Sequence, residues 1–431
     1  MHGSPSFASA HSDGLARSSA PLASAPFPSA ATLCAHAGAS FEDGEPLVAP
    51  LVLSTTFCQS GLAGPDGQGS RAPHRYSRES NPTVAALERS LAALEDAPHA
   101  LAFTTGLAAE TALFLGLLQS GDHVVCSRAL YGGTTRLLQR ILAPFGLGAT
   151  FVDTADLDAT AAAFEPRTKL LFVETPANPT LALSDLRALA GLAHASGALL
   201  AVDNTFLTPV LQRPLDLGAD LTVSSTTKFV DGHSTALGGV IVTRDPALHE
   251  RLFFLRKCTG AIQSPFQAWL TLQGLKTLPL RLQRQSASAA RIAEHLAAHP
   301  EVTVLHYPTR ANAALAAHQH LGAHGAVLSF ELAGGYERAR AFLQHVRLCR
   351  LAEHVGSVET LLTHSASMTH AGVPREERER IGIAEGLLRL SVGLEEPGEL
   401  LADLDRALQA TREFAAATPC SAAPRAVELR S

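Results

Sequence analysis

The sequence predicts an α/β protein in which a large sheet domain precedes a smaller C-terminal α+β domain. Its 431 residues are the length of two domains rather than one. Between about residues 120 and 225, short apolar runs alternate with Ala- and Leu-rich helical segments, an order typical of α/β domains. From about Leu280, a long amphipathic helix leads into two further apolar runs, and this change of order predicts the second domain.

Two helices are expected ahead of the first of these apolar runs. The segment Pro82–Glu95 places Leu87, Leu91 and Leu94 on one face, and its proline is suited to a first helical turn. A second helix is expected to start after Gly106.

The apolar runs predict strands. They are short and lack a polar alternation, which is typical of strands buried on both faces of a parallel sheet. In the large domain we expect strands at His123–Cys126, Thr150–Val152, Leu170–Glu174, Leu199–Asp203 and Leu221–Ser224. In the second domain we expect a helix at Leu282–His299 and strands at Val302–Tyr307 and Ala326–Leu332.

The segments are expected in a fixed order along the chain: a leader (1–30), an N-terminal arm (31–85), the α/β domain (86–278), the C-terminal α+β domain (279–414) and a tail (415–431). The leader and the tail share a Ser- and Ala-rich composition that predicts disorder. The leader has no basic start followed by a continuous apolar stretch, so we expect no secretory signal.

Composition excludes several classes of protein. Hydrophobic residues make up 46% of the chain and charged residues 17%, which predicts a soluble globular protein. A net charge of −6 gives no basic bias toward nucleic acid, and no apolar run is long enough to cross a membrane. Six scattered cysteines without a C-x-x-C pair predict free thiols in the cytoplasm. The 19 histidines include no HExxH motif, and we expect no metal site.

Polar residues follow several of the predicted strands, at the edge where open α/β sheets bind ligands. Glu174 and Asp203 each end a strand, and hydroxyl residues 224–227 follow another. Thr105–Gly106 opens a helix in the way that offers backbone N–H groups to an anion. The chain has no GxxxxGK[ST] motif, no complete dinucleotide fingerprint and no GxSxG elbow.

Lysine is scarce, which limits the positions available for amine chemistry. The four lysines are Lys169, Lys228, Lys257 and Lys276. Only Lys228 follows a strand and a run of four hydroxyl residues, a setting suited to a lysine that holds an aldehyde as a Schiff base beside a phosphate. An acid at another strand end, Asp203, would keep a pyridine nitrogen protonated. The sequence therefore predicts a pyridoxal phosphate (PLP) site.

A series of longer motifs then makes a family resemblance specific. They are TLCAHAG (32–38), YSR with NPT (76–78 and 81–83), YGGT (131–134), ETPANPT (174–180), VDNT (202–205), STTK (225–228) and RLSVGLE (389–395). In this order they resemble the Cys/Met-metabolism family of PLP enzymes, over about 360 residues. The resemblance implies the aspartate-aminotransferase-like PLP-dependent transferase fold, fold type I.

The resemblance also implies residue roles. Lys228 would bind the cofactor covalently and move protons, and Tyr131 would stack on the ring. Asn178 would contact the ring 3-oxygen, Asp203 the ring nitrogen, and Arg389 the substrate α-carboxylate. The phosphate would be bound by Gly106, Leu107, Ser225 and Thr227, together with Tyr76 and Arg78 from the arm of a neighbouring subunit. A homo-oligomer with shared active sites, a dimer of dimers, is therefore expected.

The exact reaction stays open among family members. Glu353 matches a position that is often Glu in cystathionine γ-synthases and γ-lyases, where it would hold a distal ammonium, and these two activities are the first expectation. His354 departs from the usual serine and resembles O-acetyl- or O-succinylhomoserine sulfhydrylases, the alternative. Glu79 disfavours a succinylated substrate, and Gly133 disfavours methionine γ-lyase; cystathionine β-lyase is a further possibility. Two readings outside these reactions are an aminotransferase and a PLP-fold binding protein without catalysis.

Overall fold

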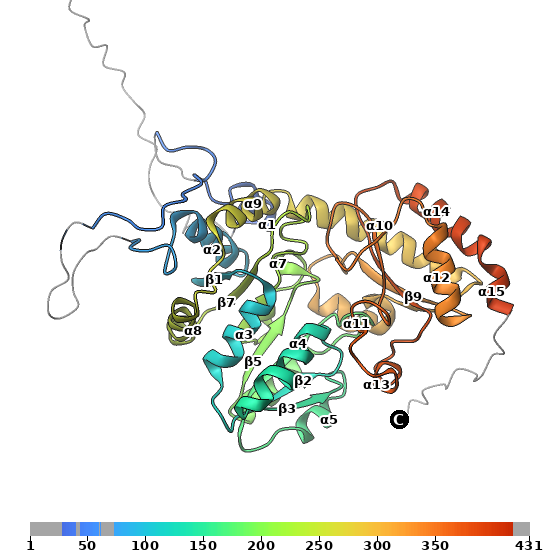
Figure 1. Cartoon of the computed structure of the whole chain (residues 1–431), viewed down its shortest axis with the longest axis horizontal. Coiled ribbons are helices and arrows are strands. Elements are labelled where there is room, and N and C mark those ends of the chain that lie inside the picture. Colours follow the sequence, from blue (N-terminus) through green and yellow to red (C-terminus); the bar gives the residue numbers. More distant parts are fainter. Residues whose placement is uncertain (1–27, 40–43, 60, 62–72, 417–431) are drawn as a thin grey trace, which may run out of the picture.

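The computed structural model describes residues 28–39, 44–59, 61 and 73–416, and these form two lobes, each built around one sheet (Figure 1). The first lobe contains a seven-stranded sheet with the order β1-β7-β6-β5-β4-β2-β3. The second contains a five-stranded sheet with the order β10-β11-β12-β9-β8. A large sheet domain followed by a smaller α+β domain is the predicted fold class.

The elements have the following bounds. The large sheet contains β1 (His99–Phe103), β2 (His123–Ser127), β3 (Gly148–Val152), β4 (Thr168–Glu174), β5 (Leu199–Asp203), β6 (Leu221–Ser224) and β7 (Gly239–Thr243). The small sheet contains β8 (Val302–His306), β9 (Val327–Leu332), β10 (Arg350–Leu351), β11 (Leu361–His364) and β12 (Leu387–Ser391). The helices of the first lobe are α1 (Ala30–Ala35), α2 (Pro82–Leu94), α3 (Gly106–Leu117), α4 (Gly132–Arg136), α5 (Leu157–Ala162), α6 (Leu186–Ala195), α7 (Thr208–Leu211), α8 (Pro246–Thr259) and α9 (Pro265–Leu275). They are followed by α10 (Leu278–Ala298), α11 (Pro308–Gln319), α12 (Gly335–His345), α13 (Arg375–Arg380), α14 (Pro397–Ala410) and α15 (Arg412–Ala416).

The five strands predicted for the large domain are confirmed as β2 to β6, which pair in parallel. β7 pairs antiparallel with both β1 and β6, so the sheet is mixed. Neither β1 nor β7 was predicted, although all five residues of β7 are buried.

Helices cover both faces of the large sheet, as the uninterrupted apolar runs require. Along β4, Leu171 and Val173 pack on one face with residues of α2, α6 and α9. Leu170 and Phe172 pack on the opposite face with residues of α3 and α8. The alternation within one strand places two hydrophobic layers around one sheet.

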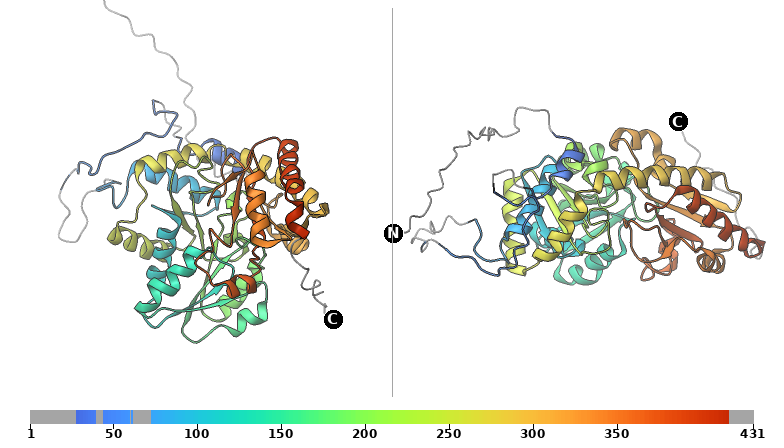
Figure 2. Two further views of the ribbon diagram at one scale, coloured as in Figure 1. Left: turned by 45° about the vertical axis from the view of Figure 1, so that its right-hand side comes forward. Right: turned by 90° about the horizontal axis from the view of Figure 1, so that it is seen from above.

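Helix α10 connects the two lobes, as the two views in Figure 2 show. Leu278 and Leu282, in its first turns, pack into the core of the large sheet. Ile292 and Leu296, further along, pack into the core of the second lobe. The predicted domain boundary at 278/279 therefore falls at the start of a helix that belongs to both cores.

The N-terminal arm is anchored at both ends. At its first end, α1 packs against α2 and α10. At its second end, Asn81 caps α2 by accepting from Thr83 N at 2.9 Å. Between the two helices, apolar side chains are exposed, among them Leu47 (81%) and Leu53 (69%). Most of the predicted leader and tail lies outside the described residues, but Ser29 caps α1 and residues 415–416 belong to α15. In the described parts of the chain, no helix is long and apolar enough to cross a membrane.

Glu95, just after α2, has a buried carboxyl group that makes stability depend on pH. The residue is 2% exposed, Thr222 donates to its Oε1 at 3.1 Å, and its Oε2 has no hydrogen-bond partner among the described residues. Burial, together with the charge of Asp216, raises the pKa of Glu95 to about 8. The folded state keeps a proton that the unfolded chain releases above its ordinary pKa, so stability falls as the pH rises toward 8.

The substitution Glu95→Gln should remove this dependence, because the amide has the shape of the protonated acid and carries no charge. Between about pH 5.5 and 7.5, the wild type should lose up to about 1.4 kcal/mol of unfolding free energy per pH unit relative to the variant. Urea unfolding of both proteins at several pH values measures this difference. Parallel pH profiles would show that Glu95 is ionised in the folded state.

Candidate active site

A cavity of about 340 Å³ lies at the carboxyl ends of the large sheet and is also lined by residues of the second lobe. It contains ten of the twelve predicted site residues: Gly106, Leu107, Tyr131, Asn178, Asp203, Ser225, Thr227, Lys228, Glu353 and Arg389. The other two, Tyr76 and Arg78, lie on the arm, outside this wall. One cavity therefore gathers residues that are up to almost three hundred positions apart in the sequence.

The N-terminus of α3 forms one end of the cavity. Thr105 caps the helix by accepting from Ala108 N at 3.0 Å. A side chain at Gly106 would place its Cβ 2.9 Å from Ser225 Cβ, and one at Gly239 would lie 2.3 Å from Thr105 O. Because neither position carries a side chain, the helix starts closely against β7 and the loop after β6, and the first residues of the helix line the cavity together with Ser225.

Thr227, in the same loop, uses its hydroxyl within the protein. It donates to Gly238 O at 3.1 Å and accepts from Gly238 N at 2.9 Å. Ser225, by contrast, donates its backbone N–H to Thr205 Oγ1 at 2.8 Å, and its hydroxyl makes no hydrogen bond to the described residues. Ser225 is therefore the hydroxyl that is free to bind a phosphate.

Three buried carboxyl groups line the floor of the cavity: Asp203, Glu174 and Glu110. Thr205 N donates to Asp203 Oδ1 at 2.8 Å, and burial raises the pKa of Asp203. Burial and the charge of Asp203 raise the pKa of Glu174, and the same two causes raise the pKa of Glu110 to about 8. A cationic ring nitrogen beside Asp203 would relieve this excess of buried negative charge.

Glu174 and Glu110 also organise the wall around Tyr131. Glu174 accepts from the backbone N–H groups of Tyr131 (2.8 Å) and Asn178 (3.0 Å), and Glu110 accepts from Thr134 Oγ1 at 2.7 Å. In the sequence, Glu174 stands at a strand end and begins the motif ETPANPT (174–180), but no role in the site was predicted for it, and Glu110 was not singled out. The signal that could have found Glu110 is its position one helical turn after Gly106.

Lys228 lies between the two lobes. Its Nζ is 3.2 Å from His354 Nδ1. Burial, together with the charge of Arg389, lowers the pKa of Lys228 to about 8. About a tenth of the amine is therefore neutral at pH 7, far more than at the ordinary pKa of 10.5, and the neutral amine is the nucleophilic form.

Arg389, on β12, is 3% exposed and joins the lobes. Its Nη1 donates to Asn178 Oδ1 at 2.8 Å, and its Nη2 donates to Thr363 Oγ1 at 3.1 Å and His354 O at 3.2 Å. The Nε has no hydrogen-bond partner among the described residues. Because Asn178 accepts through Oδ1, its NH2 group is the end of the amide that could donate to a ring oxygen.

Tyr76 and Arg78 are positioned away from this subunit's own cavity. The Arg78 guanidinium lies 5.3 Å from the centre of the Tyr76 ring, and its Nη1 donates to Lys257 O at 2.8 Å. Tyr76 is 41% exposed. The pair therefore lies at the surface, outside the cavity.

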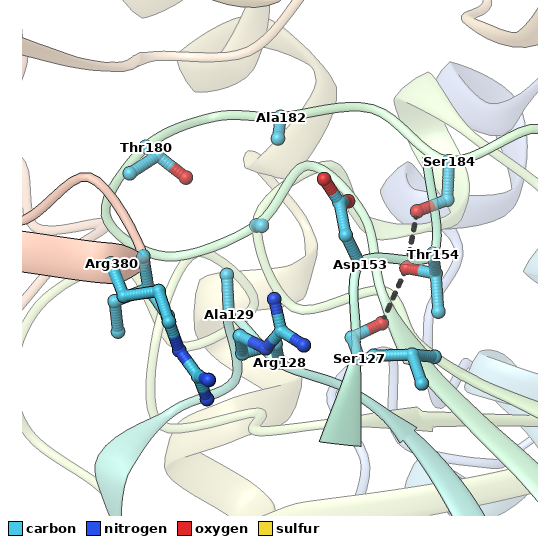
Figure 3. Close-up of a pocket in the computed structure, with 12 residues that line it drawn as sticks. Ser127, Arg128, Ala129, Asp153, Thr154, Thr180, Ala182, Ser184 and Arg380 are labelled. Carbon is cyan, nitrogen blue, oxygen red and sulfur yellow. Dashed lines mark hydrogen bonds between the residues drawn. The ribbon is translucent and has the colours of Figure 1, made fainter. Parts of the chain in front are cut away.

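A second, smaller cavity of about 130 Å³ lies near the ends of β2 and β3 and beside α13 (Figure 3). Hydroxyl groups of Ser127, Thr154 and Ser184 form a chain along it, with distances of 2.8 and 2.7 Å. Arg128 and Arg380 also line it, but none of the predicted site residues does. The chemistry implied by the sequence belongs to the larger cavity.

The residues of the larger cavity fit PLP: a lysine for the aldehyde, a buried acid for the ring nitrogen, and a helix start with a free hydroxyl for the phosphate. The fold and this donor set define a PLP-dependent enzyme of fold type I. The family model described as "Cys/Met metabolism PLP-dependent enzyme" matches residues 31–409. The chain belongs to this family of enzymes of sulfur amino-acid metabolism.

Known proteins similar to this chain differ in their reactions. The cystathionine γ-lyase of Dictyostelium discoideum is 42% identical over 86% of this chain and 96% of that protein. The cystathionine β-lyase MetC of Bacillus subtilis (strain 168) is 43% identical over 84% of this chain and 91% of that protein. A solved structure of cystathionine γ-synthase from Xanthomonas oryzae pv. oryzae, in complex with cystathionine, has a TM-score of 0.85 and 40% identity, covering 90% of this chain and 99% of that one.

Proposed function

We propose that the enzyme acts at Cγ of amino acids derived from homoserine, as a cystathionine γ-lyase or γ-synthase. The observation that carries the proposal is the cavity itself, in which Lys228, Asp203 and Arg389 share a wall with the carboxylate of Glu353. The γ-lyase and γ-synthase relatives support the same reaction class.

The cofactor, when bound, supplies a ring that accepts electrons from the substrate carbon. Asp203 would hold the ring nitrogen in its protonated form, and Tyr131 would cover the ring. The Lys228 amine, with a pKa near 8, would take a proton from Cα of the substrate and return protons to later positions. Burial around Lys228 excludes water that would otherwise compete for these protons.

Substrate orientation is assigned to two side chains of the second lobe. Arg389 would bind the α-carboxylate. The donors would be its Nε, which has no partner among the described residues, and the Nη1 and Nη2 groups that donate to Asn178 and Thr363 in this structure. Glu353 lines the same cavity and is exposed, so its carboxylate is available to the distal ammonium of cystathionine. A substrate held at both ends leaves Cγ between them.

The reaction class is tested by a substrate panel together with the substitution Glu353→Ala. The panel contains cystathionine, cysteine with O-acetyl- or O-succinylhomoserine, sulfide with either ester, and methionine. If Glu353 binds the distal ammonium, the substitution should raise KM for cystathionine about tenfold, with a smaller effect on kcat. Glu353→Gln keeps the size without the charge and should behave like the alanine variant.

Two other outcomes of the panel would replace the proposal. Turnover of sulfide with little turnover of cystathionine would identify a sulfhydrylase, the alternative that His354 favours. Exclusive release of homocysteine and pyruvate from cystathionine would identify a β-lyase, the reaction named for the Bacillus subtilis relative.

We also propose a homo-oligomer, a dimer of dimers in the cytoplasm, in which the arm completes the neighbour's site. The exposed apolar arm and the surface position of Tyr76 and Arg78 support this assembly, and the free thiols of the described cysteines support the compartment. Chains carrying Tyr76→Phe and Arg78→Ala should regain part of the activity when exchanged with Lys228→Ala chains, because each mixed dimer then has one intact site. Activity is measured after subunit exchange, against each inactive parent alone; no recovery would contradict the shared site.

A further inference from the structure

His354 contacts the active-site lysine from the other lobe of the protein. Its Nδ1 lies 3.2 Å from Lys228 Nζ, although the two residues are 126 positions apart. The His354 ring lines the same cavity as Asp203 and Arg389. Its Nε2 is buried and has no hydrogen-bond partner among the described residues. Among the described residues, Lys228 is therefore the one hydrogen-bond partner of this ring.

The backbone around His354 is fixed against the lysine. Arg389 donates to the carbonyl oxygen of His354, and Gly356 N donates to Ser391 Oγ at 2.9 Å. A side chain at Gly356 would place its Cβ 2.5 Å from Phe229 N and 2.9 Å from the carbonyl carbon of Lys228. The imidazole is held at the lysine by packing and hydrogen bonds of its own segment.

The surroundings keep this imidazole neutral. Burial and then the charges of Lys228 and Arg389 lower the pKa of His354 to about 4, against the opposite effects of Asp231 and Glu359. A neutral ring with its hydrogen on Nε2 offers the Nδ1 lone pair, which can accept from an ammonium or an amine. A lysine nitrogen bonded to the cofactor has at most one hydrogen left, so this contact suits the free amine.

We propose that His354 is a positioning residue that holds the free amine of Lys228 while the substrate nitrogen is bonded to the cofactor. This inference rests on the proposed role of Lys228. In the exchange, the substrate nitrogen forms the double bond to the cofactor carbon as the bond to Lys228 breaks, and the two hydrogens of the substrate amine move to the Lys228 nitrogen. His354 then accepts from that amine and keeps it beside the substrate, in place for the proton transfers.

Histidine, leucine and asparagine have side chains of similar length, so comparing them at position 354 distinguishes this role from a structural one. Leucine places a methyl group where His354 has Nδ1, and asparagine places an amide oxygen there. In the holoenzymes, glycine serves as an amine that displaces Lys228 without having a γ-substituent. The apparent Kd of glycine is measured from the absorbance of the bound cofactor. It should rise about tenfold in His354→Leu, because the released Lys228 amine has lost its hydrogen-bond acceptor. It should stay within about twofold of wild type in His354→Asn.

A second readout uses the apoenzymes and needs no turnover. The rate at which added PLP becomes covalently attached depends on the neutral fraction of the Lys228 amine. Without an acceptor the ammonium is less stable, so the midpoint pH of attachment should fall by about one unit in His354→Leu and remain near the wild-type value in His354→Asn.

The outcomes distinguish this inference from the proposed function. A leucine variant that matches wild type in both measurements overturns the role of His354, and so does an asparagine variant as impaired as leucine. If instead Lys228→Ala still attaches the cofactor covalently, the proposed function itself fails. A leucine variant that retains the bound-cofactor absorbance shows that the site has folded.

Discussion

The substitution Lys228→Ala is expected to abolish turnover and to remove the absorbance of the covalently attached cofactor. Lys228 is the lysine that the cavity contains, and its partly neutral amine is expected to carry each proton transfer at the substrate carbon atoms. General acid–base catalysis contributes about 10²–10⁴-fold per step, so loss of one group that serves several steps should leave kcat below a measurable level.

The small number of lysines makes a matched control available. Lys169→Ala changes an exposed lysine on β4 and should leave both activity and absorbance unchanged. Borohydride reduction of the wild-type holoenzyme should then place the reduced cofactor on the peptide that contains Lys228. A Lys228→Ala enzyme with full turnover and a reducible cofactor would exclude the assignment.

The substitution Asp203→Asn should lower kcat by about 10²–10³ with little change in the amount of cofactor bound. The asparagine amide has the same shape, but it does not stabilise a protonated ring nitrogen, so the ring accepts electrons less readily. The folded protein should not be weakened, because the variant removes a buried carboxyl group whose pKa is already raised by burial.

Glu110→Gln is the control for Asp203→Asn. Glu110 is buried in the same floor, but its pKa of about 8 leaves it mostly protonated at neutral pH, so a neutral amide changes little there. We expect kcat within a few fold of wild type near pH 7, measured beside Asp203→Asn with the same substrate. Similar losses in both variants would show that total negative charge, rather than the position of Asp203, is what the reaction needs.

The elements most accurately predicted from sequence were those with a local signal. The strands β2 to β6 are apolar runs between turn residues, and their order alone predicts a common ligand edge. β7 was missed because a strand that joins the sheet antiparallel continues no strand–helix alternation. β1 was missed because His-Ala-Leu-Ala-Phe has no β-branched residue and fits a helix equally well.

The difference between features with and without a local sequence signal also holds for the site. Ten predicted residues share one cavity, and seven of them could be identified one by one because they lie in the long motifs. The hydroxyl of Thr227 also bonds to Gly238, and no motif reports such a pairing. The contact between Lys228 and His354 depends on how two lobes meet, and a sequence pattern does not encode that geometry.

The glycine at position 356 also constrains how such enzymes can diverge. The atoms of Lys228 and Phe229 occupy the space where any side chain at Gly356 would begin, whereas Glu353 three positions earlier extends into the cavity. Natural selection can therefore exchange the residue that meets the far end of a substrate while the backbone beside the lysine stays unchanged. New substrate preferences can arise along this segment without rebuilding the catalytic centre.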